Sequence, residues 1–207
     1  MTDIATHSSA PLLLPSLRRS LTNYRPRRMS ERAFAAINAD TAQPVDAAVL
    51  IAMVPVEDQL EVVLTRRVDS LRHHAGQVSF PGGRMDPTDT SLDAAARREA
   101  NEEIGLPGDA VEVLGHLDEL PTLTGFRVTP VVGLVTRPVA WVPNPDEVAR
   151  VFQVPLAWLF DPANVTAMAR EIRGHQVTLH RFEWEQEVIW GATAAMIMNL
   201  KAIVTGP

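Results

Sequence analysis

The sequence predicts an α+β fold, a sandwich in which helices flank a mixed central sheet. Short segments with strand character are mixed with helical segments in an irregular order along the chain. A strand, a diglycine and a helix with three glutamates follow one another within residues 78–104. The 207 residues are 46% apolar, which is enough for a substantial core, and the length is high for one domain but short for two.

The expected elements follow from apolar periodicity and from turn residues. Strands are expected at residues 45–55, 61–65, 78–80, 111–117, 128–136 and 176–184. Helices are expected at residues 91–104, 155–160 and 192–204, and another is expected to start at 146–151, after the turn Pro143-Asn144-Pro145. Phe80-Pro81-Gly82-Gly83 is expected to end its strand in a turn.

Residues 1–44 are expected to form an N-terminal extension to a domain that spans residues 45–207. The extension is rich in arginine and has few acids, and short helices are expected at residues 14–22 and 30–39. An arm that packs on the domain or on a partner subunit is favoured over an anionic tether.

The helix expected at residues 91–104 contains the main candidate functional residues. Thr90 or Ser91 is a suitable N-cap, and Gly105 a suitable C-terminal residue. Glu99, Glu102 and Glu103 fall within an arc of roughly 100° beside an apolar stripe. Like charges at this spacing repel by roughly 0.2–0.5 kcal/mol per pair, and a bound divalent cation would reverse the penalty. A solvated charged face is the alternative for the run taken alone.

Three carboxylates suit Mg2+ or Mn2+, which prefer oxygen ligands. Upstream, Arg67 and Arg72 stand beside His73 and His74, close in sequence to the diglycine. Arginines are suited to the several charges of a phosphorylated substrate, and a solvated strand end is the alternative for each residue. At most one of the two histidines faces the substrate, since adjacent residues of an extended segment point to opposite sides.

At these residues the chain resembles the Nudix hydrolases, whose signature is G-x5-E-x7-R-E-U-x-E-E-x-G-U, with U aliphatic. The matching positions are Gly83, Arg98, Glu99, Ala100, Glu102, Glu103, Gly105 and Leu106. Asp89 stands where the signature has its first Glu, and eight residues rather than seven separate it from Arg98. The resemblance implies that the first acid is a structural partner of Arg98, and a shorter acid with a longer spacing can keep that pair.

The segment before the Nudix signature looks like the extra signature of the coenzyme A pyrophosphatase branch. The residues in register are Arg67, Leu71, Arg72, His74, Gly76 and Val78. This resemblance implies metal-dependent hydrolysis of the diphosphate of coenzyme A (CoA) and acyl-CoA to 3′,5′-ADP and (acyl-)4′-phosphopantetheine. One alternative is a Nudix hydrolase for ADP-ribose, NADH or dinucleoside polyphosphates. The other is a non-catalytic nucleotide sensor, which would normally have lost one glutamate of the signature.

Site roles follow from the resemblance. Mg2+ or Mn2+ is expected at Glu99, Glu103 and the carbonyl of Gly82, with Glu102 as a further ligand or as the base. Glu147 is the other candidate for the base, and the choice stays open. Arg98 is expected to orient the acids, and Arg67, Arg72 and His74 to bind substrate.

Composition argues against nucleic-acid and membrane partners, and the resemblance implies a small-molecule nucleotide substrate. A net charge of −6 argues against general nucleic-acid binding, and the chain has no cysteine for a disulfide, a thiolate site or a nucleophile. No apolar run is long enough for a membrane span, so a cytoplasmic location is expected. Whether the protein is a homodimer stays open. Met196 and Met198 are expected to be core or dimer-contact residues rather than ligand groups. Trp190 is expected to serve packing, with a contact to the pantetheine arm as the alternative.

Overall fold

The computed structural model describes residues 10–37, 43–71, 74–172 and 175–206. The helices are α1 (Ala10–Asn23), α2 (Glu31–Ile37), α3 (Leu92–Ile104), α4 (Leu156–Phe160) and α5 (Gly191–Thr205), with 3-10 turns at Gly108–Ala110 and Pro162–Asn164. The strands are β1 (Val45–Val56), β2 (Gln59–Arg67), β3 (Val78–Ser79), β4 (Gly82–Arg84), β5 (Val111–His116), β6 (Leu120–Pro121), β7 (Phe126–Val135), β8 (Val148–Pro155), β9 (Val165–Ile172), β10 (His175–Trp184) and β11 (Glu187–Trp190).

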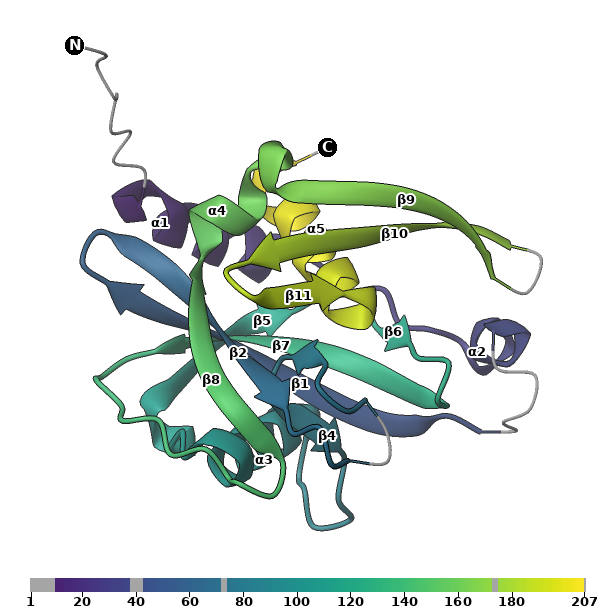
Figure 1. The fold of residues 1–207 in the computed structure, drawn as a ribbon, viewed down its shortest axis with the longest axis horizontal. Coiled ribbons are helices and arrows are strands. Elements are labelled where there is room, and N and C mark those ends of the chain that lie inside the picture. Colours follow the sequence, from purple (N-terminus) through teal and green to yellow (C-terminus); the bar gives the residue numbers. More distant parts are fainter. Residues whose placement is uncertain (1–9, 38–42, 72–73, 173–174, 207) are drawn as a thin grey trace.

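The larger sheet is mixed, as expected. Its main path runs β3-β2-β1-β7-β5, with β4 paired to β1, β6 to β7 and β8 to β2. β1 and β7 are parallel, and the other pairs are antiparallel. A smaller antiparallel sheet has the order β11-β10-β9. Figure 1 shows α3 below the larger sheet and α1, α5 and the smaller sheet above it, so the predicted sandwich is confirmed.

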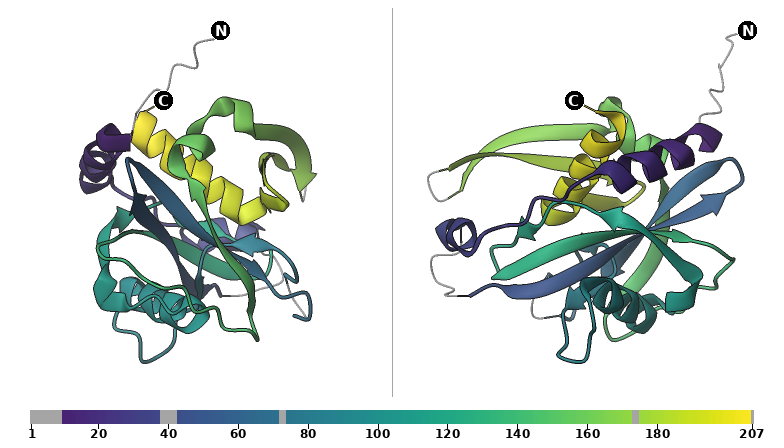
Figure 2. Two further views of the ribbon diagram at one scale, coloured as in Figure 1. Left: turned by 60° about the vertical axis from the view of Figure 1, so that its left-hand side comes forward. Right: turned by 180° about the vertical axis from the view of Figure 1, so that it is seen from behind.

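The side chains of β1 point alternately to the two faces of the sheet and so belong to two separate parts of the core. Ala48, Leu50 and Ala52 belong to the apolar cluster that includes the buried alanines of α3. Ile51 and Met53 belong to the cluster on the other face, which includes residues of α5 and β10. Because successive strand residues point to opposite faces, this one strand holds α3 and α5 on opposite sides of the sheet, as Figure 2 shows.

Helix α1 packs against the rest of the described chain. α1 contacts α5, β5 and β2, and Leu17 and Leu21 are buried in the core. Arg18 makes two hydrogen bonds to the carboxylate of Glu112 at the start of β5. The division of the chain at residue 44 stays a prediction.

One predicted helix is wrong. Residues 148–155 form strand β8, antiparallel to β2, where a helix was expected to start at 146–151. Val148, Phe152 and Val154 are buried on this strand, and β-branched and aromatic side chains suit a half-buried strand. The turn expected at Gly82 and Gly83 is also wrong, because both residues pair with β1 as part of β4.

The other predicted elements that carry the site are confirmed, with α3 starting at Leu92 after Ser91. β9 and β11 lacked a clear alternating pattern and were not predicted. In the described ranges, no helix combines the length and the apolar character needed to cross a membrane.

Candidate active site

Helix α3 holds the acids at one end of the sheet. Ser91 begins the helix by accepting a hydrogen bond from the Ala94 N–H through its side chain. Gly105 ends it in the left-handed conformation, with φ of 69°. Its N–H donates to the Asn101 carbonyl at 2.9 Å, and the Leu106 N–H donates to the Ala100 carbonyl at 3.3 Å. Ala100 packs under the sheet with no exposed surface, which leaves the neighbouring glutamates at the rim of the packed face.

Glu103 is the most buried of these acids, at 3% exposure. The Gly82 N–H donates to its Oε2 at 3.3 Å, and Arg67 Nη1 lies 3.6 Å from its Oε1. Burial raises the pKa of Glu103 to about 7, which Arg67 and the Gly82 amide oppose and the charges of Glu147 and Glu99 increase. The carboxylate is therefore held where its negative charge is poorly solvated.

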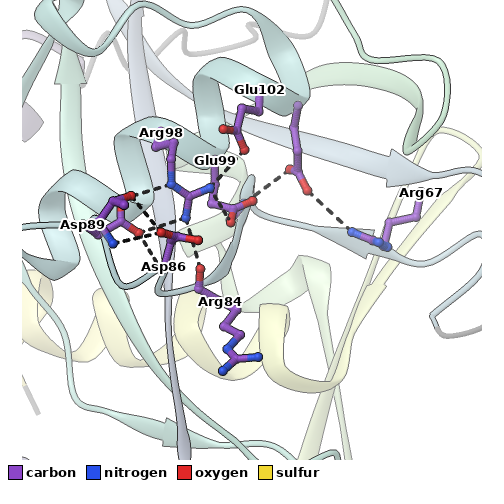
Figure 3. A network of polar contacts seen from close by, with 10 residues as sticks. Arg67, Arg84, Asp86, Asp89, Arg98, Glu99 and Glu102 are labelled. Carbon is purple, nitrogen blue, oxygen red and sulfur yellow. Dashed lines mark hydrogen bonds and ion pairs between the residues drawn. The ribbon is translucent and has the colours of Figure 1, made fainter.

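Arg98 organises the other acids (Figure 3). Its Nε and Nη2 donate to the two oxygens of Asp89 at 3.1 and 2.9 Å, and Nη1 donates to Glu99 at 2.9 Å and Glu102 at 3.0 Å. Nη2 also donates to the carbonyl of Arg84 in β4. The expected pairing of Asp89 with Arg98 is confirmed, and the pair holds the pKa of Asp89 below its usual range.

Two glycines bring β4 against the helix. A Cβ atom on Gly83 would lie 2.6 Å from the carboxylate of Glu99, so Glu99 can occupy its position only because residue 83 has no side chain. A Cβ on Gly82, whose φ is 155°, would lie 2.4 Å from the carbonyl oxygen of Ala48 in β1. The diglycine therefore permits two close approaches, one to the acid and one to the sheet.

The Nudix domain family matches residues 45–182, which is more than half of the chain. The chain belongs to the Nudix family. Two relatives are named "Uncharacterized Nudix hydrolase NudL": one from Escherichia coli O7:K1 is 43% identical over 164 residues, covering 79% of this chain and 85% of that protein. The other, from Salmonella heidelberg, is 42% identical over the same length and coverage. These names specify no substrate.

A solved structure supports the fold. The MutT/nudix family protein from Enterococcus faecalis covers 98% of this chain and 73% of its own, with a TM-score of 0.50 and 16% sequence identity. Identity at this level shows a shared fold alone. The Nudix fold and the acidic helix α3 thus agree with the family match.

Glu147 approaches the acids of the Nudix helix from outside it. Its charge raises the pKa of both Glu99 and Glu103, although less than their burial does. The backbone holds this segment: the Asn144 N–H donates to the Glu103 carbonyl at 2.8 Å, and the Val68 N–H donates to the Glu147 carbonyl at 3.0 Å. The segment that follows Pro143 is therefore fastened to α3 on one side and to the end of β2 on the other.

The structure brings most of the predicted site residues together. Arg67, Gly82, Arg98, Glu99, Glu102, Glu103 and Glu147 lie around one end of α3. His74 is exposed, and its Nδ1 lies 2.8 Å from Oε1 of Gln77. Arg72 and His73 lie outside the described residues.

Sequence reasoning missed the pair of Asp93 with His116 and the cavity lined by Gln77, Gln186 and Trp190. Trp190 is 48% exposed, so the expectation that it packs internally is wrong. The tryptophan ends a short strand that was not predicted, and its exposure depends on where the β10–β11 hairpin lies against β3. No local sequence pattern carries that information.

The acids fit a hard divalent cation by the chemistry of their donors. Within the described ranges, no three histidine, aspartate or glutamate side chains are grouped closely enough to hold a metal ion, and Arg98 instead contacts Glu99 and Glu102. Glu103 is nevertheless buried among like charges, a situation that costs free energy until a cation offsets it. Carboxylates and a backbone carbonyl are the ligands that Mg2+ and Mn2+ prefer.

Proposed function

We propose that the protein hydrolyses the diphosphate bond of CoA and acyl-CoA, giving 3′,5′-ADP and (acyl-)4′-phosphopantetheine. Water attacks one phosphorus, the bond from that phosphorus to the bridging oxygen breaks, and the bridging oxygen leaves with the other phosphate. Family membership supports the diphosphate chemistry. The CoA assignment is supported by the segment at residues 67–78, whose Arg67 reaches the buried acid of the Nudix helix at 3.6 Å.

The acids of α3 have the ligand role in this proposal. Glu99, Glu103 and Glu102 with the carbonyl of Gly82 would hold Mg2+ or Mn2+, and the bound cation would neutralise phosphate charge and activate water. Arg98 orients Glu99 and Glu102 through its two hydrogen bonds to them. Asp89 in turn fixes the guanidinium, so its role is positioning.

Glu147 is favoured over Glu102 as the base that accepts the proton of water. The Glu102 side chain is 57% exposed and pairs with Arg98, so it lies at the outer rim of the cluster. Glu147 belongs to a segment that backbone hydrogen bonds hold to α3 and to the end of β2, and its charge acts on Glu99 and Glu103. Glu147 lies outside the helix that supplies the cation ligands. It could therefore accept the proton of water without giving up a ligand role.

Arg67 is the main candidate for binding a phosphate of the substrate. Its guanidinium lies beside Glu103, and its Nε is buried without a hydrogen-bond partner in the described structure. A buried donor of this kind costs free energy unless it is satisfied, and a phosphate oxygen would satisfy it. His74 and Arg72 stay predictions for the same role.

A substrate panel with product identification by mass spectrometry tests this function. The purified protein is incubated with CoA, acetyl-CoA, ADP-ribose, NADH and a dinucleoside polyphosphate, each with Mg2+ and with chelator. Formation of 3′,5′-ADP and 4′-phosphopantetheine from CoA, abolished by chelator, supports the proposal. Ready cleavage of ADP-ribose with neither product from CoA overturns it in favour of another nucleoside diphosphate derivative.

A further inference from the structure

A cavity borders the end of β2 on the side away from the Nudix helix. It has a volume of about 270 Å³ and is lined by Arg66, Gly76, Gln77, Gln186, Glu187, Val188 and Trp190. Its walls come from the end of β2, residues 76–77 directly before β3, and the β10–β11 hairpin. Pockets that hold a whole drug-sized ligand are larger, about 300–1,000 Å³, so this volume suits one part of a larger substrate.

The cavity and the acids lie on the two sides of one strand end. Arg66 and Arg67 are neighbours on β2, so their side chains point to opposite faces, Arg67 toward Glu103 and Arg66 into the cavity. The Arg67 N–H donates to the Gln77 carbonyl at 3.0 Å. A substrate whose diphosphate lies at the acids can therefore extend past this strand end into the cavity.

The lining combines groups suited to a phosphorylated purine nucleoside. Trp190 presents an indole that is 48% exposed, and bases stack on such rings. Gln77 has its amide oxygen beside His74 Nδ1, and glutamine amides can bind the edge of adenine with two hydrogen bonds. Among the described residues, Arg66 forms an ion pair with the exposed Asp69 alone, at 3.2 Å, a contact weak enough to be exchanged for a phosphate.

The remaining charge of the cavity is already balanced. Glu187 is 7% exposed, and Arg150 lies 3.4 Å from its carboxylate while also contacting Glu185. Arg66 is thus the group free to exchange partners. A pantetheine arm is uncharged, so it would use the amides and the indole but would bring no group to replace Asp69 at this guanidinium.

We infer that the cavity between β2, β3 and the β10–β11 hairpin binds the 3′-phosphoadenosine part of the substrate. Trp190 stacks on the base, Gln77 reads its edge and Arg66 binds the 3′-phosphate. The inference rests on the proposed function for the link to hydrolysis, and it assigns the adenosine half of CoA to this side of β2.

The test measures binding of fragments that cannot be hydrolysed at a diphosphate. Adenosine 3′-phosphate, adenosine and 4′-phosphopantetheine are titrated by calorimetry into the wild type, Trp190→Ala, Trp190→Phe and Arg66→Gln. Trp190→Ala should weaken adenosine 3′-phosphate binding roughly tenfold, and Trp190→Phe should retain most of it. Arg66→Gln should reduce the affinity for adenosine 3′-phosphate to that for adenosine. Leu123→Ala, at a residue 59% exposed on another loop, is the matched surface control.

Three results would overturn the inference: no binding of adenosine 3′-phosphate to the wild type at millimolar concentration, equal affinities of the wild type and Trp190→Ala, or a loss confined to 4′-phosphopantetheine. Thermal melting of every variant separates unfolding from lost contacts. Because the fragments need no catalysis, the expected pattern would support the cavity even if CoA were not cleaved. Cleavage of CoA with no effect of Trp190→Ala would overturn the cavity and leave the proposed function standing.

Discussion

Asp89 accepts two hydrogen bonds from Arg98, which lies nine residues after it and also contacts Glu99 and Glu102. The Asp89 side chain is only 5% exposed. The Asp86 N–H donates to it at 2.8 Å, so the loop before α3 holds the shorter acid in reach of the guanidinium. Replacement of the signature glutamate therefore preserves the pair through the loop geometry.

Arg98→Lys is expected to lower kcat roughly 10- to 100-fold, as the loss of an outer-shell partner does at other metal sites. Lysine keeps the charge but cannot reproduce the planar fork that reaches Asp89 and the two glutamates at once. Steady-state kinetics with Mg2+ measures the effect, and circular dichroism checks the fold. A kcat equal to that of the wild type would show that the guanidinium does not position the acids.

Glu103→Gln is expected to reduce turnover by about 100-fold or more, because it removes a cation ligand. The fold should remain, since glutamine has almost the same volume. Glu183→Gln is the control, on a glutamate whose side chain is 68% exposed in β10. Activity is measured against Mg2+ concentration, and near-normal turnover at saturating Mg2+ would contradict the ligand role.

The two glycines of β4 should differ in their response to alanine. Gly83→Ala displaces the flexible Glu99 carboxylate, so activity should fall strongly while stability changes by about 1 kcal/mol or less. Gly82→Ala meets the backbone of Ala48 and Val49, so it should lower stability by about 1–3 kcal/mol. Denaturant unfolding and kinetics separate the two effects, and equal losses of stability would contradict the assignment.

Glu147→Gln should lower kcat more than Glu102→Gln does, by about tenfold or more, if Glu147 accepts the proton of water. Each of the two substitutions removes one negative charge and keeps the size of the side chain. Rates are compared at saturating Mg2+ from pH 6 to pH 9. A larger loss with Glu102→Gln would transfer the role of the base to the Nudix helix.

The pair of His116 and Asp93 ties β5 to the first turn of α3, with Nε2 and Oδ1 2.6 Å apart. The hydrogen bond to Asp93 raises the pKa of His116, against burial and the charge of Arg28. The same hydrogen bond lowers the pKa of Asp93, with burial opposing it and the charge of Arg97 assisting it. The charged pair therefore contributes stability mainly at mildly acidic pH.

His116→Gln should cost the folded state roughly 0.5–1 kcal/mol, because both side chains are partly exposed. Since the pKa of His116 is raised in the folded state, its contribution is present below the unfolded value of about 6.5 and is lost as the pH rises through the folded value. The pKa of Asp93 is lowered in the folded state, so the contribution of Asp93 to stability is lost as the pH falls below about 4. Urea unfolding of both proteins from pH 3 to pH 9 measures the difference, and a pH-independent difference would contradict the pair.

Local patterns were sufficient for the parts of this protein that depend on near neighbours. Helix α3, its Ser91 cap and the clustering of its glutamates follow from helical period and capping, which act over a few residues. The error at β8 has the same origin: Val148 and Phe152 follow a proline turn that suits a helix start, while their pairing with β2 involves residues more than 80 positions away. Sheet pairing of this range is invisible to a local pattern.

The acids of α3, the diglycine and the arginine of the preceding segment were all evident from the amino-acid sequence, because their spacing and chemistry are properties of the chain itself. Only the tertiary structure decided that Gly83 meets Glu99, that Arg67 reaches Glu103 and that Trp190 stays exposed beside Arg66. These contacts depend on strand register and on the position of a hairpin, which are set by long-range packing of the whole sheet.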